Sequence, residues 1–172
     1  MKKYFVIFST LLLLVGCDRL TKIQAIDSLK GNNPISYFGG FFKFIYVENS
    51  GAMLGLGGTL PGDLRFYIFT VAVGIILFGG LIYIAIKPMS KINLILGLLI
   101  VGGGFGNLYD RAFNDGLVVD FMLIGIGPLR TGIFNVADIA ITVGAIGLII
   151  FTSKWGKKLT NIFQQTAKSS GC

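Results

Sequence analysis

The 172-residue sequence predicts an α-helical membrane protein, and three observations support this fold class. Hydrophobic residues make up 53% of the chain and charged residues only 13%, against about 25% charged residues in soluble proteins. Four apolar segments approach or exceed the roughly 20 residues that a membrane-crossing helix needs. Glycine, which is commoner in membrane helices than in soluble ones, occurs 25 times. We therefore expect residues 1–172 to form a single integral membrane domain with four transmembrane helices.

The four expected transmembrane segments differ in how clearly the sequence marks them. They cover residues 4–20, 65–86, 92–110 and 133–153. The second is the clearest because it is uncharged after Arg65, whereas the first is short and has to extend to residue 20 to cross a bilayer. Pro88 cannot continue a helix and marks a tight connection between the second and third segments. Residues 23–63 form a polar and aromatic insert that is too long for a simple connector.

The charged residues indicate how the chain is oriented in the membrane. If the four segments alternate in direction, eight lysines lie on one side: Lys2, Lys3, Lys87, Lys91, Lys154, Lys157, Lys158 and Lys168. The eight acidic and the other seven basic residues lie on the opposite side or at its membrane edge, so the two sides carry charges of +8 and −1. The positive-inside rule then places both termini in the cytoplasm and the insert outside it. This asymmetry accounts for the net charge of +7 without a nucleic-acid partner.

The residue types that are missing narrow the possible chemistry. Histidine is absent, which removes it both as a catalytic base and as a metal ligand. The two cysteines, Cys17 and Cys172, stand far apart and have no metal-binding or redox spacing. We therefore expect no metal site and no cofactor.

Several charged and amide side chains fall in or beside the apolar segments, where they are costly. Asp18 and Lys22 are one helical turn apart, so they share a face and are expected to form an interfacial ion pair. The end of the third segment carries Asn107, Asp110 and Arg111. Gly102 and Gly106, just before them, have the spacing that allows two membrane helices to pack closely. All of these positions gather at the end of the bundle that faces the insert.

Two aspartates are candidates for catalysis. Asp120 follows two valines in an expected extended segment, and Asp138 lies about one turn inside the fourth apolar segment, where a carboxylate is unusual. Two neighbouring carboxyl groups cannot both ionise at low cost, so one keeps a proton near neutral pH while the other can take a proton from water. Only the fold can bring these side chains together. A structural ion pair between Asp138 and Arg111 is the alternative.

Five short blocks of the sequence resemble the lipoprotein signal peptidases, or signal peptidase II, a family of four-span aspartic proteases. The blocks are Asp18-Arg-Leu-Thr-Lys22, Asn49-Ser-Gly-Ala52, Gly106-Asn-Leu-Tyr-Asp-Arg111, Val118-Val-Asp-Phe121 and Phe134-Asn-Val-Ala-Asp138. Each block is weak evidence alone, but five blocks in the family's order on four expected spans form a strong pattern. One departure is Met53-Leu54, where the family commonly places an aromatic residue.

The resemblance implies an intramembrane aspartic endopeptidase that removes the signal peptide from diacylglyceryl-modified prolipoproteins. Cleavage is expected just before the lipidated cysteine, at the outer leaflet of the bacterial inner membrane. Asp120 and Asp138 match the catalytic pair that activates water. Positions that bind the substrate or support this pair are matched by Asn49, Gly51, Asn107, Asp110, Arg111 and Asn135, and structural positions by Asp18 and Lys22.

The resemblance also implies the architecture outside the membrane, the partners and the location. The insert 23–63 matches a periplasmic β-cradle and a loop that close over the substrate. Diacylated prolipoproteins and membrane lipids are the expected partners, globomycin-type peptides are the expected inhibitors, and the protein is expected to be a monomer. The active site is expected to face the periplasm of a multi-pass inner-membrane protein with cytoplasmic termini.

Two other functions remain open from the sequence. Asp138 and Arg111 could form an ion or proton relay in a small transporter, although no internal repeat supports this interpretation. Ser50 and Lys22 could form a serine/lysine protease, although the neighbours of Ser50 favour a turn.

The N-terminal segment raises a separate question, because Leu14-Val-Gly-Cys17 resembles the cleavage site of a bacterial lipoprotein. Cleavage would leave Cys17 as a lipidated N-terminus. However, the block that begins at Asp18 needs the first span attached if it is to hold its place in the bundle. We therefore expect the segment to be retained and Cys17 to be a small apolar packing residue.

Overall fold

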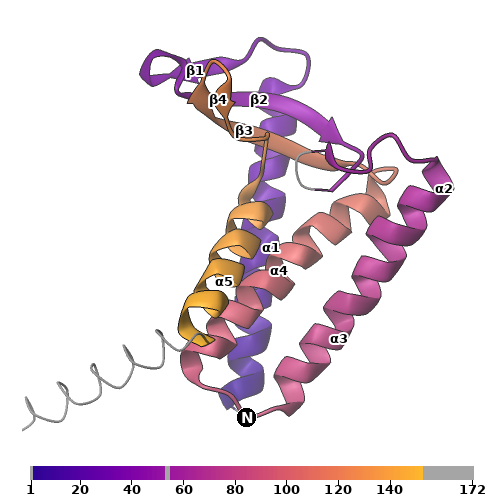
Figure 1. Cartoon of the computed structure of the whole chain (residues 1–172), viewed down its shortest axis with the longest axis vertical. Helices are drawn as coiled ribbons and strands as arrows, with labels where there is room; N and C mark the ends of the chain where they lie inside the picture. The colour runs from indigo at the N-terminus through magenta and orange to yellow at the C-terminus, as the bar shows by residue number, and fades with distance from the viewer. Residues whose placement is uncertain (1, 53–54, 153–172) are drawn as a thin grey trace, which may run out of the picture.

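The computed structural model describes residues 2–52 and 55–152, which form a helical bundle capped at one end by a small sheet (Figure 1). The elements are α1 (Lys2–Leu29), β1 (Ile35–Tyr37), β2 (Phe42–Asn49), α2 (Gly62–Arg65), α3 (Val73–Ile86), α4 (Lys91–Phe113), β3 (Val118–Ile126), β4 (Leu129–Arg130) and α5 (Val136–Thr152). A short helical turn, η1 (Phe38–Gly40), joins β1 to β2, and a π-helical segment, η3 (Phe66–Ala72), joins α2 to α3. The predicted fold class is confirmed.

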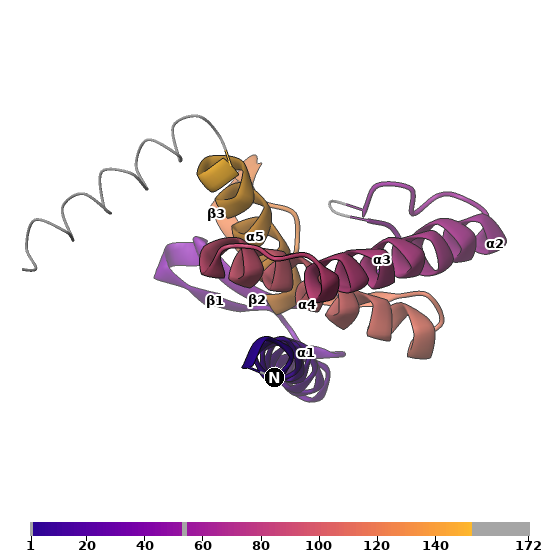
Figure 2. The ribbon, with the colours of Figure 1, turned by 90° about the horizontal axis from the view of Figure 1, so that it is seen from below.

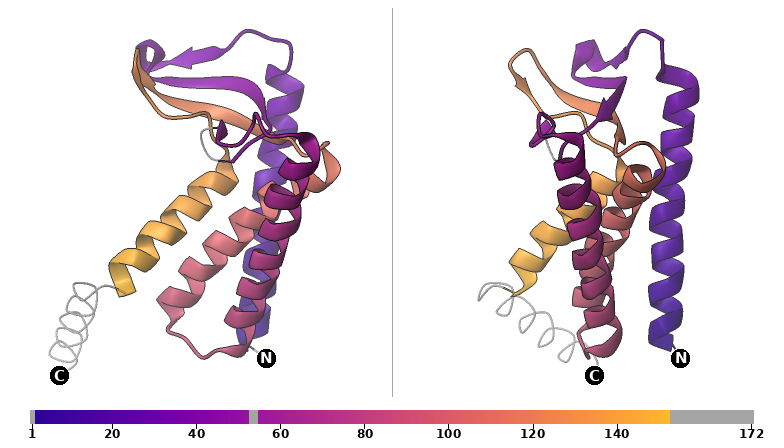
Figure 3. Two further views of the ribbon diagram at one scale, coloured as in Figure 1. Left: turned by 45° about the vertical axis from the view of Figure 1, so that its right-hand side comes forward. Right: turned by 90° about the vertical axis from the view of Figure 1, so that its right-hand side faces the viewer.

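Within the described residues, three helices are long and apolar enough to cross a membrane. They are α1, the continuous helix Gly62–Ile86 that runs from α2 through α3, and α4. The fourth, α5, is apolar and has 17 described residues. Outside the described residues lie the end of the fourth expected span and four lysines used to predict the orientation: Lys154, Lys157, Lys158 and Lys168. The N-terminus and the α3–α4 connection lie together at the end of the bundle opposite the sheet (Figure 3).

Helix α1 extends well beyond the predicted span and takes up the first residues of the predicted insert. Its last turns are stabilised by burial, because Ala25 and Leu29 are each 5% exposed and pack in a cluster with Phe121 of β3. At its other end, the Lys3 ammonium donates hydrogen bonds to the carbonyl oxygens of Ala85 (3.1 Å) and Lys87 (2.7 Å). A cation there satisfies carbonyl groups that the end of α3 leaves without helical partners.

The prediction that Cys17 packs inside the bundle is wrong. Its side chain lies on the exposed face of α1, whereas the next residue, Asp18, is buried. Neighbouring residues of a helix point in directions about 100° apart, so only one of the two can face the other helices. The buried side of α1 at this level is used by polar residues.

Helix α4 lies between α1 and α5, as the view along the bundle shows (Figure 2). Its glycine-rich stretch makes this possible, because an added Cβ atom would overlap a different helix at successive positions: Leu14 of α1 at Gly102, Ala137 of α5 at Gly103 and Leu77 of α3 at Gly104. At Gly106 the added atom would meet the carboxylate of Asp18 at 2.7 Å. The predicted role of Gly102 and Gly106 in close helix packing is confirmed.

The four strands form one antiparallel sheet in the order β1-β2-β3-β4, which lies across the ends of the helices (Figure 1). Only β1 and β2 come from the predicted insert; β3 and β4 come from the segment between α4 and α5. The sheet therefore combines segments that are distant in sequence. Its β2–β3 register pairs Val47 with Asp120 and Asn49 with Val118, which places Asn49 diagonally opposite Asp120.

Substituting Gly103 by alanine tests the close packing of α4. The added methyl carbon would lie 2.5 Å from the Ala137 carbonyl oxygen, so we expect the free energy of unfolding to fall by about 1–3 kcal/mol. Gly79→Ala is the matched control, because Gly79 lies on α3 where an added Cβ atom meets open space. Thermal unfolding of the purified protein in detergent measures both variants. Equal melting temperatures for the two would contradict the packing argument.

Candidate active site

The buried polar side chains of the described residues gather in one cluster beneath the sheet. These residues are Asp18, Lys22, Asn107, Asp110, Asp120 and Asn135, all at most 8% exposed. They come from α1, α4, β3 and the segment just before α5, so no single stretch of sequence forms the cluster. All six were predicted site or structural residues. Because burying polar groups without partners is costly, each needs a hydrogen-bond partner inside the cluster.

Asp138 is held by the N-terminus of α5. The N–H group of Asp138 donates to Asn135 Oδ1 at 2.9 Å, and the N–H group of Asn135 donates back to Asp138 Oδ2 at 3.1 Å. This reciprocal pair has the geometry of a capping box, with an aspartate in the position that glutamate usually takes. The second Asp138 oxygen accepts a hydrogen bond from Asn107 Nδ2 at 2.8 Å. The carboxylate is therefore fixed at the positive end of the helix dipole, where a negative charge is stabilised.

Asp120 is held from two sides in strand β3. Its Oδ1 accepts a hydrogen bond from Asn135 Nδ2 at 2.6 Å, and its Oδ2 accepts one from Asn49 Nδ2 at 2.9 Å. Asn135 therefore bonds to both aspartates, with its side chain on Asp120 and its backbone N–H on Asp138. The structure thus brings together the two carboxyl groups that the sequence separates. Asn49, from the insert, and Asn135 hold them in place.

Burial raises the pKa of Asp120 from its ordinary value of 3.8 to about 6. The loss of hydration is the largest cause, and the nearby charge of Asp138 raises the pKa further. The hydrogen bond from Asn49 opposes this shift by favouring the ionised form. Asp120 therefore takes up a proton at a pH at which an exposed aspartate is fully ionised.

Lys22 occupies the centre of the cluster and is completely buried. Its Nζ lies 2.8 Å from Asp18 Oδ2 and 2.9 Å from Asp110 Oδ2, and it donates to Asn107 Oδ1 at 3.0 Å. The expected ion pair between Asp18 and Lys22 is confirmed, and both side chains are buried inside the protein. The ammonium therefore makes one hydrogen bond and two ion pairs inside the cluster.

Arg111 is bonded to the loop that follows β2. Its Nη2 donates to the Gly51 carbonyl oxygen at 2.9 Å, and the Gly51 N–H donates to Asn49 Oδ1 at 2.9 Å. Arg111 makes no ion pair with Asp138, so the alternative of a structural pair between them is not supported. A Cβ atom at Gly51 would lie 2.5 Å from the Leu56 carbonyl oxygen, which explains glycine at this position.

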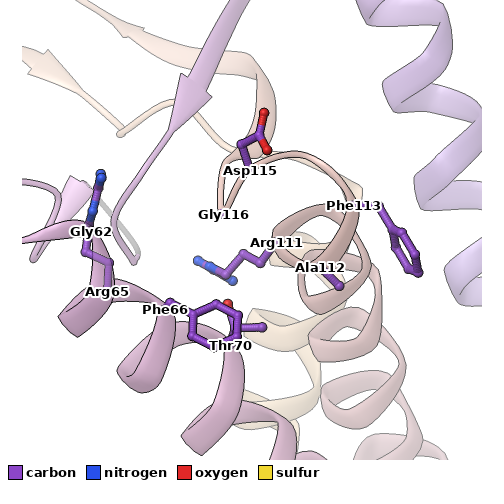
Figure 4. A pocket seen from close by; sticks show the side chains of 9 residues that line it. All are labelled: Gly62, Arg65, Phe66, Thr70, Arg111, Ala112, Phe113, Asp115 and Gly116. Carbon is purple, nitrogen blue, oxygen red and sulfur yellow. The ribbon is translucent and has the colours of Figure 1, made fainter.

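Arg111 also lines a cavity of about 640 Å³, which lies between the start of the α2–α3 helix and the end of α4. Figure 4 shows the Arg111 side chain reaching from α4 toward Phe66 and Arg65 across this cavity. Two buried polar atoms on its walls, Arg111 Nε and Thr70 Oγ1, have no hydrogen-bond partner within the described structure. Since buried donors need acceptors, this wall is suited to carbonyl or other acceptor groups of a bound molecule or to water.

Two interpretations of loop residues can be compared with the geometry. Ser50 Oγ donates to the Gly58 carbonyl oxygen at 3.4 Å, while the Lys22 ammonium is surrounded by its own acceptors. The structure therefore does not assemble a serine/lysine pair. The departure at Met53-Leu54 lies outside the described residues.

One residue that binds to the cluster from its edge was missed by the sequence analysis. Arg19 forms an ion pair with Asp110 Oδ1 at 2.5 Å, and its guanidinium stacks over the Tyr109 ring at 4.7 Å. The only signal in the sequence was its position between Asp18 and Lys22. Its partner is 91 positions away along the chain, so spacing alone could not reveal it.

Comparison with known proteins identifies the family. The sequence profile of the signal peptidase (SPase) II family matches residues 10–154. Relatives named lipoprotein signal peptidase include those of Clostridium novyi, 39% identical over 81% of this chain and 92% of the relative, and Chlorobium phaeovibrioides, 38% identical over 95% of each. The lipoprotein signal peptidase of Borrelia garinii is 33% identical, and the match covers 93% of this chain and 96% of the relative.

Solved structures show the same fold. Two structures described as bacterial membrane enzymes match with TM-scores of 0.72 and 0.73 at 27% and 28% identity. The first match covers 84% of this chain and 85% of the solved chain, and the second covers 87% of this chain and 93% of the solved chain. The bundle with its capping sheet thus defines a helical membrane enzyme of bacterial type. The chain belongs to the signal peptidase II family, and it is a protease.

The raised pKa of Asp120 predicts how stability depends on pH. In the folded protein its pKa is about 6, against 3.8 for an ordinary aspartate, so its contribution to stability is fully present below pH 3.8 and is lost as the pH rises through 6. Between about pH 4 and pH 7, wild type should lose about 2 kcal/mol of unfolding free energy relative to Asp120→Asn. Thermal unfolding across this range measures the difference. A difference that does not change with pH would contradict the shift.

Proposed function

We propose that the chain is an aspartic endopeptidase that removes the signal peptide from diacylglyceryl-modified prolipoproteins, with Asp120 and Asp138 as its catalytic pair. The observation that carries this proposal is the bridge by Asn135, which hydrogen-bonds to both carboxyl groups. The family supports the substrate class, because the relatives are named lipoprotein signal peptidases. Lipids and diacylated precursors are the proposed partners, and globomycin-type peptides the proposed inhibitors of a monomeric enzyme.

The proposed mechanism needs one proton shared between the two carboxyl groups. Both oxygens of each carboxyl group accept N–H donors, and the raised pKa of Asp120 favours placing the proton there. Ionised Asp138 takes a proton from water as the water oxygen bonds to the scissile carbonyl carbon. Asp120 gives its proton to the carbonyl oxygen. When the resulting diol collapses, one of its hydroxyl groups returns a proton to Asp120, the C–N bond breaks and the leaving nitrogen takes the proton held by Asp138.

The depth of the pair in the bundle supports a site at the membrane interface. Asp138 lies in the first turn of α5, and Asp120 lies in the sheet that caps the same end of the bundle. A substrate whose signal peptide spans the membrane presents the following residues at this level. Together with the positive-inside rule, this supports an inner-membrane enzyme with cytoplasmic termini that cleaves at the outer leaflet, facing the periplasm.

The relay alternative has less support. Asp138 and Arg111 bond to different groups, Asn107 and Asn135 in one case and Gly51 in the other, and they form no ion pair. A proton relay needs groups within hydrogen-bonding reach of one another, directly or through water.

Substituting each aspartate tests the proposed mechanism. We expect Asp120→Asn and Asp138→Asn each to lower kcat on a diacylated model peptide at least about 1,000-fold, because the amide can neither take nor supply the transferred proton. Asp27→Asn is the matched control, since Asp27 is exposed on α1. Cleavage is followed by mass spectrometry, with circular dichroism to confirm folding. Retained cleavage in both variants would rule out the pair, and loss of ion flux on the same changes would favour the relay.

The retained N-terminal segment can be tested by intact-mass measurement. We expect the purified chain to keep residues 1–16 and an unmodified Cys17, because cleavage would remove Lys3, which bonds to two carbonyl groups at the end of α3. It would also remove Leu14, which packs against Gly102 of α4. Cys17→Ser is the control and should have the same processing state. A mass that begins at a lipidated Cys17 would show that the enzyme is also a substrate.

A further inference from the structure

Lys22 has a place in the cluster that a purely structural role does not explain. Its ammonium is completely buried and has three acceptors, Asp18, Asp110 and Asn107. Tying helices together does not require such a group, because replacing a buried ion network by well-packed apolar side chains is often neutral or stabilising. What distinguishes Lys22 is that each of its three partners also bonds to a second group, either Asp138 itself or the backbone next to one of the two aspartates.

Two of the acceptors hold the N-terminus of α5. Asp18 Oδ1 accepts the N–H of Ala137 at 2.9 Å, one residue before Asp138. Asn107 Oδ1 faces Lys22, so the amide is turned to direct its Nδ2 at Asp138, to which it donates at 2.8 Å. If Asn107 flipped, its NH₂ group would face the ammonium and its oxygen would face the carboxylate. Lys22 therefore helps to determine which end of Asn107 reaches Asp138, together with Asn135 Nδ2, which donates to the same Asn107 oxygen at 3.1 Å.

The third acceptor holds strand β3. Asp110 Oδ2 lies 2.9 Å from Lys22 Nζ and also accepts the N–H of Val119 at 3.1 Å, one residue before Asp120. The other Asp110 oxygen pairs with Arg19. Because a shift of one residue reverses the face of every side chain in a strand, this bond helps to set which way Asp120 points.

We propose that Lys22 is a positioning residue that orients both aspartates of the catalytic pair through its three acceptors. This inference rests on the proposed aspartic mechanism. The charged groups around Lys22 on the packed elements are Asp18 and Arg19 of α1, Asp110 and Arg111 of α4, Asp120 of β3 and Asp138 of α5. Its positive charge also acts on Asp120, which is not a direct partner.

Lys22→Met tests the proposal, because methionine keeps an unbranched side chain while removing the charge and all three donors. We expect kcat on a diacylated model peptide to fall about 100-fold with KM little changed, since small misplacements of catalytic groups have effects of this size. We also expect the pH above which kcat/KM falls to move upward, because the charge of Lys22 lowers the pKa of Asp120.

Two further variants separate positioning from folding. Lys22→Arg keeps the charge, but its planar fork cannot direct donors to three converging acceptors, so we expect lower kcat with a nearly unchanged pH profile. Lys30→Met is the matched control. Lys30 follows the end of the same helix and pairs with Glu48 at 3.0 Å on the surface, so this variant should keep wild-type kcat and pH profile.

The outcomes distinguish this inference from the proposed function. Wild-type kcat and pH profile in Lys22→Met would overturn it, as would a lower melting temperature with unchanged kinetics. Failure of both Lys22 variants to accumulate as folded protein, while Lys30→Met does, would assign Lys22 to folding alone and also overturn it. If Asp120→Asn and Asp138→Asn retained cleavage, the proposed function would fail whatever the Lys22 variants do.

Discussion

The structure depends on one constraint, which is that polar groups buried between membrane helices must find their partners inside the protein. The ammonium of Lys22 meets this constraint with three acceptors from α1 and α4. Those acceptors in turn satisfy backbone N–H groups at the start of α5 and in β3. Because each group has two or more partners, the helices and the sheet can fit together in one arrangement, and the aspartates take their positions from it.

Close packing of the helices is what makes the polar cluster compact. Helix α4 can lie against three other helices because its glycines leave no side chain in the way, and Gly106 leaves room for the Asp18 carboxylate. A larger residue there would separate α1 from α4 and lengthen the contacts of Lys22. The buried charges therefore depend on the glycine-rich stretch, because its small residues allow polar side chains from different helices to meet.

The two aspartates are alike in chemistry but differ in their surroundings. Asp138 belongs to a helix N-terminus, where N–H groups and the helix dipole favour a negative charge. Asp120 belongs to a buried strand, where the loss of hydration raises its pKa to about 6. Environments that separate the behaviour of two carboxyl groups are a recurrent way of obtaining an acid and a base near neutral pH. Asn135 links the two by its side chain and its backbone.

The sequence by itself determined the helical membrane class, the close packing at Gly102 and Gly106 and the candidate aspartates, because these depend on local composition, spacing and short blocks. Tertiary structure decided what depends on distant residues: the burial of Lys22, the exposure of Cys17 and the origin of the sheet in two separate segments. It also decided that Arg19 pairs with Asp110 and that Arg111 bonds to Gly51 instead of Asp138. Such contacts are set by which helix faces meet, and periodicity along one helix cannot show what the other helix presents.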